Sequence, residues 1–201
     1  MKKTVFFFVA IFATIFVAKA QEFSFKETFD GNSLEWNECP SKIFYGGTSI
    51  IDNGKLTITS KNEGAGWDIF CYSPLDIQLP FKIVSNVKVK KLESDRLVGL
   101  VFNYKDDGNY YCFAIDDYKV VFRRYVDGKL VGSITQGVKW KDKTKINQSW
   151  ELVSDGQNLK FSIDGMPILN IKYMPLEYSG FGYYTFGKQE LVVDDVEFIQ
   201  L

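Results

Sequence analysis

Hydrophobic and polar residues alternate with a period of two along most of this chain. Segments 56–59, 87–90 and 159–163 each place an apolar side chain at every second position. Successive side chains of a β-strand point to opposite faces, so this period indicates half-buried strands. No helical period of comparable length occurs after residue 20, and the chain is therefore predicted to be all-β. Pairs that favour tight hairpin turns separate the segments: Asn53-Gly54, Asp107-Gly108, Asp127-Gly128, Asp155-Gly156 and Asp164-Gly165.

The number of strands predicts two packed layers. About a dozen strands are expected, which is more than one open sheet usually holds without splitting. We therefore predict two antiparallel sheets packed as a β-sandwich. Segments 97–102 and 110–115 are apolar at consecutive positions and are expected to be central strands. No linker, repeat or low-complexity tract interrupts residues 21–201, which are predicted to form a single domain.

The first twenty residues have the pattern of a secretory signal peptide. Lys2 and Lys3 precede the apolar segment 5–17, and Ala18-Lys19-Ala20 has the small residues of a cleavage site. We expect cleavage before Gln21 and an exported protein, either periplasmic or secreted. No later segment approaches the roughly 20 apolar residues of a membrane helix, so no membrane span is expected in the mature chain.

Charge and composition exclude several classes of function. The chain has 24 basic and 25 acidic residues, and loss of three signal-peptide lysines leaves a net charge of about −4, so no nucleic-acid partner is expected. The sequence contains no histidine, which excludes Ser/His/Asp and Cys/His catalysis and makes a zinc site unexpected. Of the three cysteines, Cys112 is expected as a buried free thiol, whereas pairing of Cys39 with Cys71 is left open.

Several segments resemble, in order and spacing, the strands of a known superfamily. They are residues 27–31 followed by Trp36, then 51–58, 99–104, 109–113, 122–128, 150–152, 159–165, 180–184 and 194–196. Together they resemble concanavalin A-like, laminin G-like jelly rolls over nearly all of the mature chain. The resemblance implies a two-sheet antiparallel β-sandwich of that type, a fold that carries many different activities.

The last predicted strand contains two adjacent carboxylates in an apolar run. Strict alternation places Asp194 on one face with Val196 and Phe198, where an unpaired carboxylate would be costly. The resemblance implies that the first and last strands lie together with a structural calcium ion between them, held by Asp30, Asp194 and Asp195. The alternative is that one aspartate is bound by backbone amides or a lysine while the other faces water.

A catalytic alternative rests on carboxylates. Glucanases of this fold resemble one another in a Glu-x-Asp-x-x-Glu strand motif, which this chain lacks. If the chain is a glycoside hydrolase, Asp195 and Glu197 are the candidate pair, because i, i+2 positions on a strand approach the separation of about 5 Å that retaining chemistry needs. They lie on the terminal strand, however, where the resemblance predicts no cleft.

Aromatic residues favour carbohydrate binding, because pyranose rings stack on tryptophan and tyrosine. Trp67 follows Gly64-Ala65-Gly66 and is the best candidate for an exposed stacking ring, the alternative being a buried anchor. If the central strands open onto a groove, Asn103, Tyr111, Arg123 and Tyr125 would line it with Trp67. The alternative is ordinary cross-strand packing.

These observations favour one function over two alternatives. The favoured function is an exported, non-catalytic domain that binds a carbohydrate or glycan. The alternatives are a glycoside hydrolase that uses carboxylates only and a protein-interaction module of a bacterial envelope assembly.

Overall fold

The computed structural model describes residues 23–38, 46–64, 66–140 and 146–201, except for the side chain of Trp67. These residues form fourteen strands and no helix, hence no helix that could cross a membrane. The strands are β1 Phe23–Glu27, β2 Gly47–Asp52, β3 Lys55–Ser60, β4 Gly66–Tyr72, β5 Phe81–Val89, β6 Leu97–Asp106, β7 Asn109–Ile115, β8 Lys119–Val126, β9 Lys129–Gly137, β10 Asn147–Ser154, β11 Asn158–Ile163, β12 Met166–Lys172, β13 Gly180–Phe186 and β14 Glu190–Gln200. The prediction of an all-β chain is confirmed.

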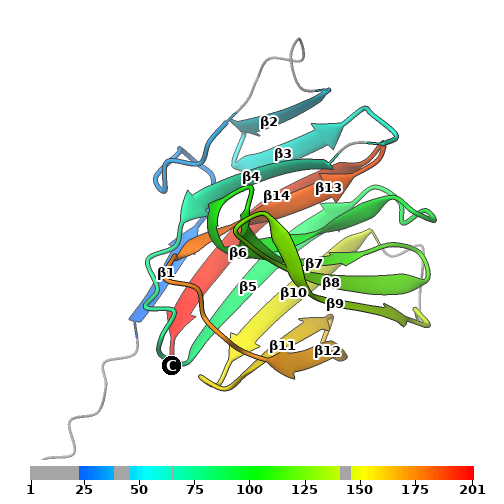
Figure 1. Cartoon of the computed structure of the whole chain (residues 1–201). Coiled ribbons are helices and arrows are strands. Elements are labelled where there is room, and N and C mark those ends of the chain that lie inside the picture. Colours follow the sequence, from blue (N-terminus) through cyan, green and yellow to red (C-terminus); the bar gives the residue numbers. More distant parts are fainter. Residues whose placement is uncertain (1–22, 39–45, 65, 141–145) are drawn as a thin grey trace, which may run out of the picture.

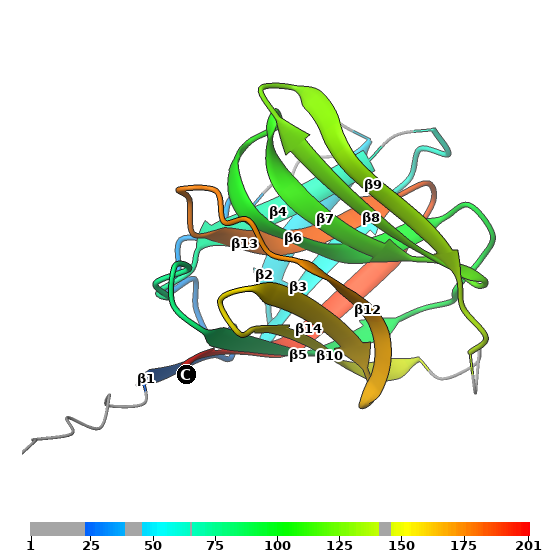
Figure 2. The same ribbon diagram turned by 60° about the horizontal axis from the view of Figure 1, so that its bottom comes forward.

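The strands of the described chain form two antiparallel sheets that pack face to face (Figures 1 and 2). The large sheet has the order β12-β11-β10-β5-β14-β3-β2, and β1 pairs with β14 outside this path. The small sheet has the order β4-β13-β6-β7-β8-β9. Consecutive strands β4 and β5, and again β13 and β14, lie in different sheets, so the chain crosses repeatedly between the layers as in a jelly roll.

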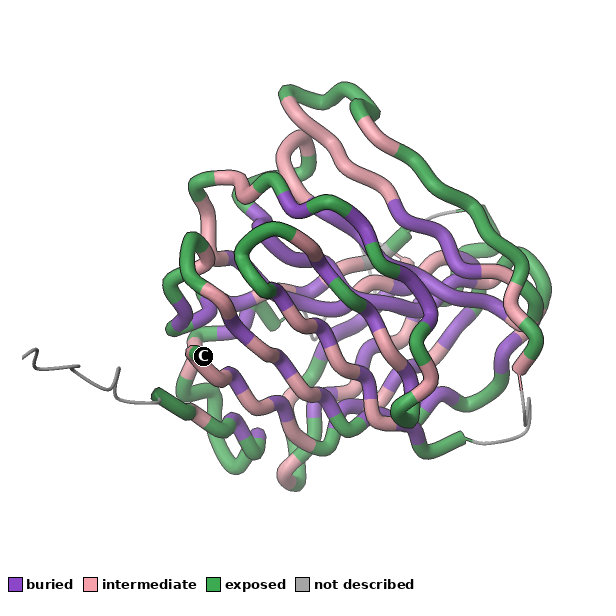
Figure 3. Tube along the Cα trace, turned by 90° about the horizontal axis from the view of Figure 1, so that it is seen from below, coloured by how far each residue is buried: buried purple, intermediate pink, exposed green. Residues whose placement is uncertain are grey.

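The core lies between the two sheets and is rich in aromatic rings. Along β3 and β11 every second residue is buried, as the alternating sequence predicts, and Figure 3 shows this alternation along the strands. Phe113 of the small sheet stacks on Phe161 of the large sheet, with ring centroids 5.2 Å apart. Phe181 of the small sheet also contacts Phe198 of the large sheet, here edge to face, with ring centroids 5.4 Å apart. Each fully buried ring of this kind contributes about 1.5–3 kcal/mol.

The central strands β6 and β7 are buried on both faces, as their sequence predicts. Phe102 and Phe113 face the large sheet, whereas Val101, Cys112 and Ala114 belong to a second apolar cluster on the outer face of the small sheet. The thiols of Cys71 and Cys112 are buried and free, which confirms the prediction for Cys112. The predicted signal peptide and Cys39 lie outside the described residues.

A β-bulge changes the direction of side chains in β14. Pairing with β5 shifts between Val193 and Asp195, so Asp194 is an extra residue. Val193 and Val196 are both buried, while Asp194 is exposed. The expectation that Asp194 shares the apolar face with Val196 and Phe198 is therefore wrong, because strict alternation does not hold across a bulge.

Lysines meet both carboxylates of this strand. Lys55 pairs with Asp194 at 2.8 Å, and Lys26 pairs with Asp195 at 3.1 Å. The Asn86 amide also donates to Asp195 at 2.8 Å. Since Lys26 belongs to β1, which pairs along β14, the first and last described strands do lie together as the resemblance implies.

Candidate functional site

The outer face of the small sheet has a floor of glycine and alanine residues, bordered by larger side chains. Gly99 of β6 and Gly182 of β13 lie at its centre, beside Ala114 of β7. A Cβ atom at Gly99 would lie 1.8 Å from the Phe113 carbonyl oxygen, and one at Gly182 would lie 2.0 Å from the Ile69 carbonyl oxygen. Neither position can carry a side chain without moving a neighbouring strand, so the floor stays bare.

A pocket of about 270 Å³ opens on this face. We call it the Asp68 pocket; its lining residues are Gly66, Asp68, Val101, Asp107, Tyr110 and Tyr184. Cross-strand pairing places Asp68 of β4 directly beside Tyr184 of β13. Its volume is close to the lower end of about 300 Å³ for small-molecule sites, so it has room for a small ligand or one unit of a longer one.

Tyrosines form one side of the pocket. Tyr110 of β7 stacks on Tyr125 of β8 with ring centroids 4.9 Å apart, and Tyr104 lies 6.0 Å from Tyr110. The Tyr104 hydroxyl donates to the Asp107 carboxylate at 2.7 Å, which holds the β6–β7 turn against the pocket. Burial raises the pKa of Tyr110 and Tyr184 above the ordinary value, so their hydroxyls stay protonated.

Asp68 is the most strongly perturbed carboxyl of this face. Burial raises the pKa of Asp68 to about 6, and the nearby Asp107 charge adds to the shift, while a hydrogen bond from the Asp68 backbone opposes it. Among the described residues no lysine or arginine forms an ion pair with Asp68. The carboxyl thus changes between a hydrogen-bond donor and a pure acceptor near pH 6.

The structure divides the side chains that the sequence predicts as ligand-binding. Arg123 and Tyr125 lie on the outer face, since they pair with Cys112 and Tyr110 of the same face. Tyr111 is buried on the opposite face, and its hydroxyl donates to the Met174 carbonyl. Placing Tyr111 in the groove is therefore wrong, because the pairing of β7 with β8 puts the neighbouring Tyr110 there instead.

The prediction that Asn103 lines the groove is also wrong. The side chain is buried, and its carbonyl oxygen accepts from the Tyr173 hydroxyl at 3.2 Å. Its φ of 49° lies where the pairing of β6 with β7 becomes irregular, which breaks the alternation after Phe102. Trp67 lies in β4 beside Asp68, and its side chain is outside the described part of the structure.

The proposed catalytic pair lies on the other sheet. Asp195 and Glu197 are partly buried on the outer face of the large sheet, where β1 pairs beside β14. The Ser24 hydroxyl donates to Glu197 at 2.8 Å, and Lys26 neutralises Asp195. Both carboxylates therefore hold β1 in place, on the side of the molecule away from the Asp68 pocket.

The predicted calcium ligands are held by other groups. Asp30 accepts from the Thr28 hydroxyl at 2.8 Å, while Asp194 and Asp195 pair with lysines. In the described ranges no three His, Cys, Asp or Glu side chains form a group that could hold a metal ion. Structural calcium stays a prediction, to be tested by a melting temperature that rises with calcium and falls with a chelator.

Comparisons with known proteins place the fold. No protein-family model matches the chain, and no curated protein matches it. The carbohydrate recognition domain of Emp47p superimposes with a TM-score of 0.62 at 11% identity, over 88% of this chain and 94% of that one. A β-glucanase of Bacillus licheniformis gives 0.60 at 11% identity over 87% and 97%. A Bacillus subtilis protein of unknown function with a galectin-like fold gives 0.58 at 16% identity over 88% and 94%.

At these identities the likeness concerns the fold. Each superposition covers most of this chain and most of the other chain. Together with the two-sheet topology, they show that this chain has a jelly-roll fold of the concanavalin A-like type.

Proposed function

We propose that the outer face of the small sheet binds carbohydrate, with the Asp68 pocket at its centre. The observation that carries this proposal is a pocket with tyrosine walls and a carboxylate that has no cationic partner among the described residues. Sugar rings offer apolar faces to aromatic side chains and hydroxyl donors to a carboxylate. The fold supports the proposal, since the similar structures include a carbohydrate recognition domain and a glucanase.

The bare floor suits an extended ligand. Because Gly99 and Gly182 carry no side chain, a sugar ring can approach the sheet closely between Tyr184 and Tyr110. Arg123, one strand further on the same face, offers hydrogen-bond donors to hydroxyl or ring oxygens. A chain of sugars lying across the strands would contact all three side chains.

Binding to a glycan array, followed by calorimetry with the best ligand, tests the proposal. Tyr184→Ala removes a stacking ring and Asp68→Asn removes a charged acceptor. Each substitution should weaken affinity by about tenfold, since each lost contact with the sugar is worth about 1–2 kcal/mol. Tyr118→Ala is the matched control, because Tyr118 is exposed and outside the pocket lining. Glycan binding that survives both pocket substitutions would show that the site lies elsewhere.

A second candidate function, glycoside hydrolysis, is favoured by one specific observation. Asp68 has a pKa of about 6 and lies near a second carboxylate, Asp107. A carboxyl whose pKa is raised near a second carboxyl is one feature of the acid and partner pair of glycosidases. Release of reducing sugar that is lost in both Asp68→Asn and Asp107→Asn, while glycan binding persists in Asp107→Asn, would support this function. Binding without turnover would support the non-catalytic one.

A further inference from the structure

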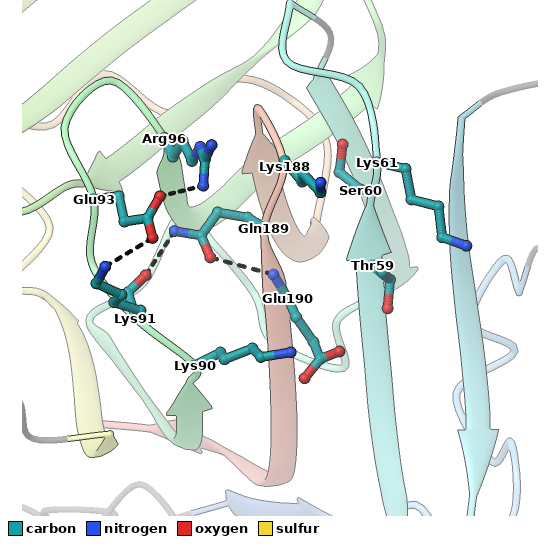
Figure 4. Close-up of a pocket in the computed structure, with 10 residues that line it drawn as sticks. All are labelled: Thr59, Ser60, Lys61, Lys90, Lys91, Glu93, Arg96, Lys188, Gln189 and Glu190. Atoms are coloured by element: carbon teal, nitrogen blue, oxygen red, sulfur yellow. Dashed lines mark hydrogen bonds and ion pairs between the residues drawn. The ribbon is translucent and has the colours of Figure 1, made fainter.

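A second and larger pocket, of about 770 Å³, lies at one end of the sandwich (Figure 4). There β3 and β5 end, β14 begins, and the loop between β5 and β6 returns to the small sheet. We call it the basic pocket; its lining residues are Thr59, Ser60, Lys61, Lys90, Lys91, Glu93, Arg96, Lys188, Gln189 and Glu190. It shares no lining residue with the Asp68 pocket.

The charge of this pocket is opposite to that of the chain. Its lining has five cations and two carboxylates, an excess of three positive charges, whereas the whole chain has a net charge of −1. The described Glu63 reaches Arg96 from outside the lining and reduces this excess by one. A local positive potential on an acidic protein attracts anions and repels cations.

The floor of the basic pocket is fixed by hydrogen bonds. Ser60 and Gln189 exchange backbone hydrogen bonds of 2.8 and 3.2 Å, and both residues are buried. The Gln189 side chain donates to the Lys91 carbonyl at 2.8 Å and accepts from the Glu190 amide at 3.3 Å. These contacts join β3, β14 and the chain after β5. The backbone that carries the lysines is therefore preorganised.

Three of the five cationic side chains form no ion pair within the described part of the chain. Arg96 pairs with Glu93 and Glu63, and Lys91 pairs with Glu93 at 3.1 Å. By contrast, Lys61, Lys90 and Lys188 form no ion pair with any described residue, and all three are exposed. Figure 4 shows Lys90 and Lys188 on opposite sides of Gln189. An anion that contacts either ammonium group would gain a charge-assisted hydrogen bond.

Two residues of the basic pocket lie close along the chain to the outer face of the small sheet. The row formed by Phe186 and Leu97 follows the row of Tyr184 towards the end of β13. Lys188 comes two residues after Phe186, and Arg96 directly precedes Leu97. Tyr184 and Lys188 are four residues apart, so their Cα atoms are separated by at most about 14 Å. A short oligosaccharide can span this distance.

We propose that the basic pocket binds a carboxylate or sulfate group of an acidic glycan whose neighbouring rings lie on the Asp68 pocket. This assignment rests on the proposed carbohydrate function. It specifies the ligand as a glycan that carries negative charge at one end of the bound segment. The carboxylate of Asp68 repels a negatively charged glycan group from the Asp68 pocket. The lysines of the basic pocket attract the same group to the ends of the strands.

The experiment compares neutral, uronate-bearing and sulfated glycans on one array, with calorimetry for the best acidic and neutral ligands. The wild-type protein should prefer acidic glycans. The double variant Lys90→Ala/Lys188→Ala should weaken acidic binding by about tenfold, as two exposed ion pairs are each worth up to about 1 kcal/mol. Neutral glycans should bind the wild-type protein and the double variant with equal affinity. Lys129→Ala/Lys172→Ala is the matched control, since these exposed lysines lie on the edge strands β9 and β12.

The outcomes separate the two proposals. Acidic preference that persists in Lys90→Ala/Lys188→Ala, or a wild-type protein that prefers neutral glycans, overturns the basic pocket and leaves the carbohydrate function intact. Absence of all glycan binding overturns both. Binding of phosphatidylglycerol vesicles in place of any acidic glycan, lost in the same double variant, would assign the pocket to a lipid surface and also overturn the glycan assignment.

Discussion

At the scale of single residues, Asp68 links the candidate site to stability. Its pKa is raised to about 6 in the folded chain, from an ordinary value of 3.8. The folded state therefore holds the proton more tightly than the unfolded state, so the free energy of unfolding falls as pH rises from about 4 to 6. Above pH 6 the ionised carboxylate is a cost of up to about 3 kcal/mol, from the size of the shift.

Replacing this carboxyl should remove that cost. We expect Asp68→Asn to be more stable than the wild-type protein at pH 7.5, by about 1–3 kcal/mol, and to lose this advantage at pH 4, where wild-type Asp68 is protonated. Urea denaturation at several pH values measures the difference. Asp127→Asn, at the exposed turn between β8 and β9, serves as the control. A less stable Asp68→Asn at pH 7.5 would mean that the carboxylate has a stabilising partner.

At the scale of strands, the glycine floor makes a structural prediction. Gly99→Ala should destabilise the fold by about 2–4 kcal/mol, because its Cβ would overlap the Phe113 carbonyl oxygen and strand β7 would have to move. Thermal or urea denaturation measures this. Gly132→Ala in β9 is the matched control, with its nearest atom at 3.7 Å, and should change stability by no more than about 0.5 kcal/mol. Equal stability of the two variants would contradict the close approach of β6 and β7.

The strand scale also explains which predictions from sequence succeed. Alternation is enough to predict the strands and the sandwich, because burial of one face repeats every two residues. It misplaces Asp194 and Asn103, since the extra residue of a bulge has no distinct sequence pattern. It also cannot choose between Tyr110 and Tyr111, because that choice depends on which face of a doubly apolar strand is outward. Asp68 and Tyr184 meet only through the pairing of β4 with β13, far apart in sequence.

At the scale of the whole molecule, the described strands are independent of the predicted signal peptide. β1 begins at Phe23, two residues after the expected new N-terminus Gln21, and pairs with β14 from Phe23 to Glu27. Cleavage before Gln21 would therefore remove no described strand.

We therefore expect full-length expression in a Gram-negative bacterium to yield an exported protein that begins at Gln21. Intact-mass measurement and N-terminal sequencing of the periplasmic fraction test this. Ala18→Asp and Ala20→Asp together should block processing, because charged residues replace the small ones of the cleavage site. A chain that keeps Met1 in the cytoplasm would contradict export. A protein made from residue 21 should still fold and melt like the processed one, since β1 closes the large sheet without the segment that precedes it.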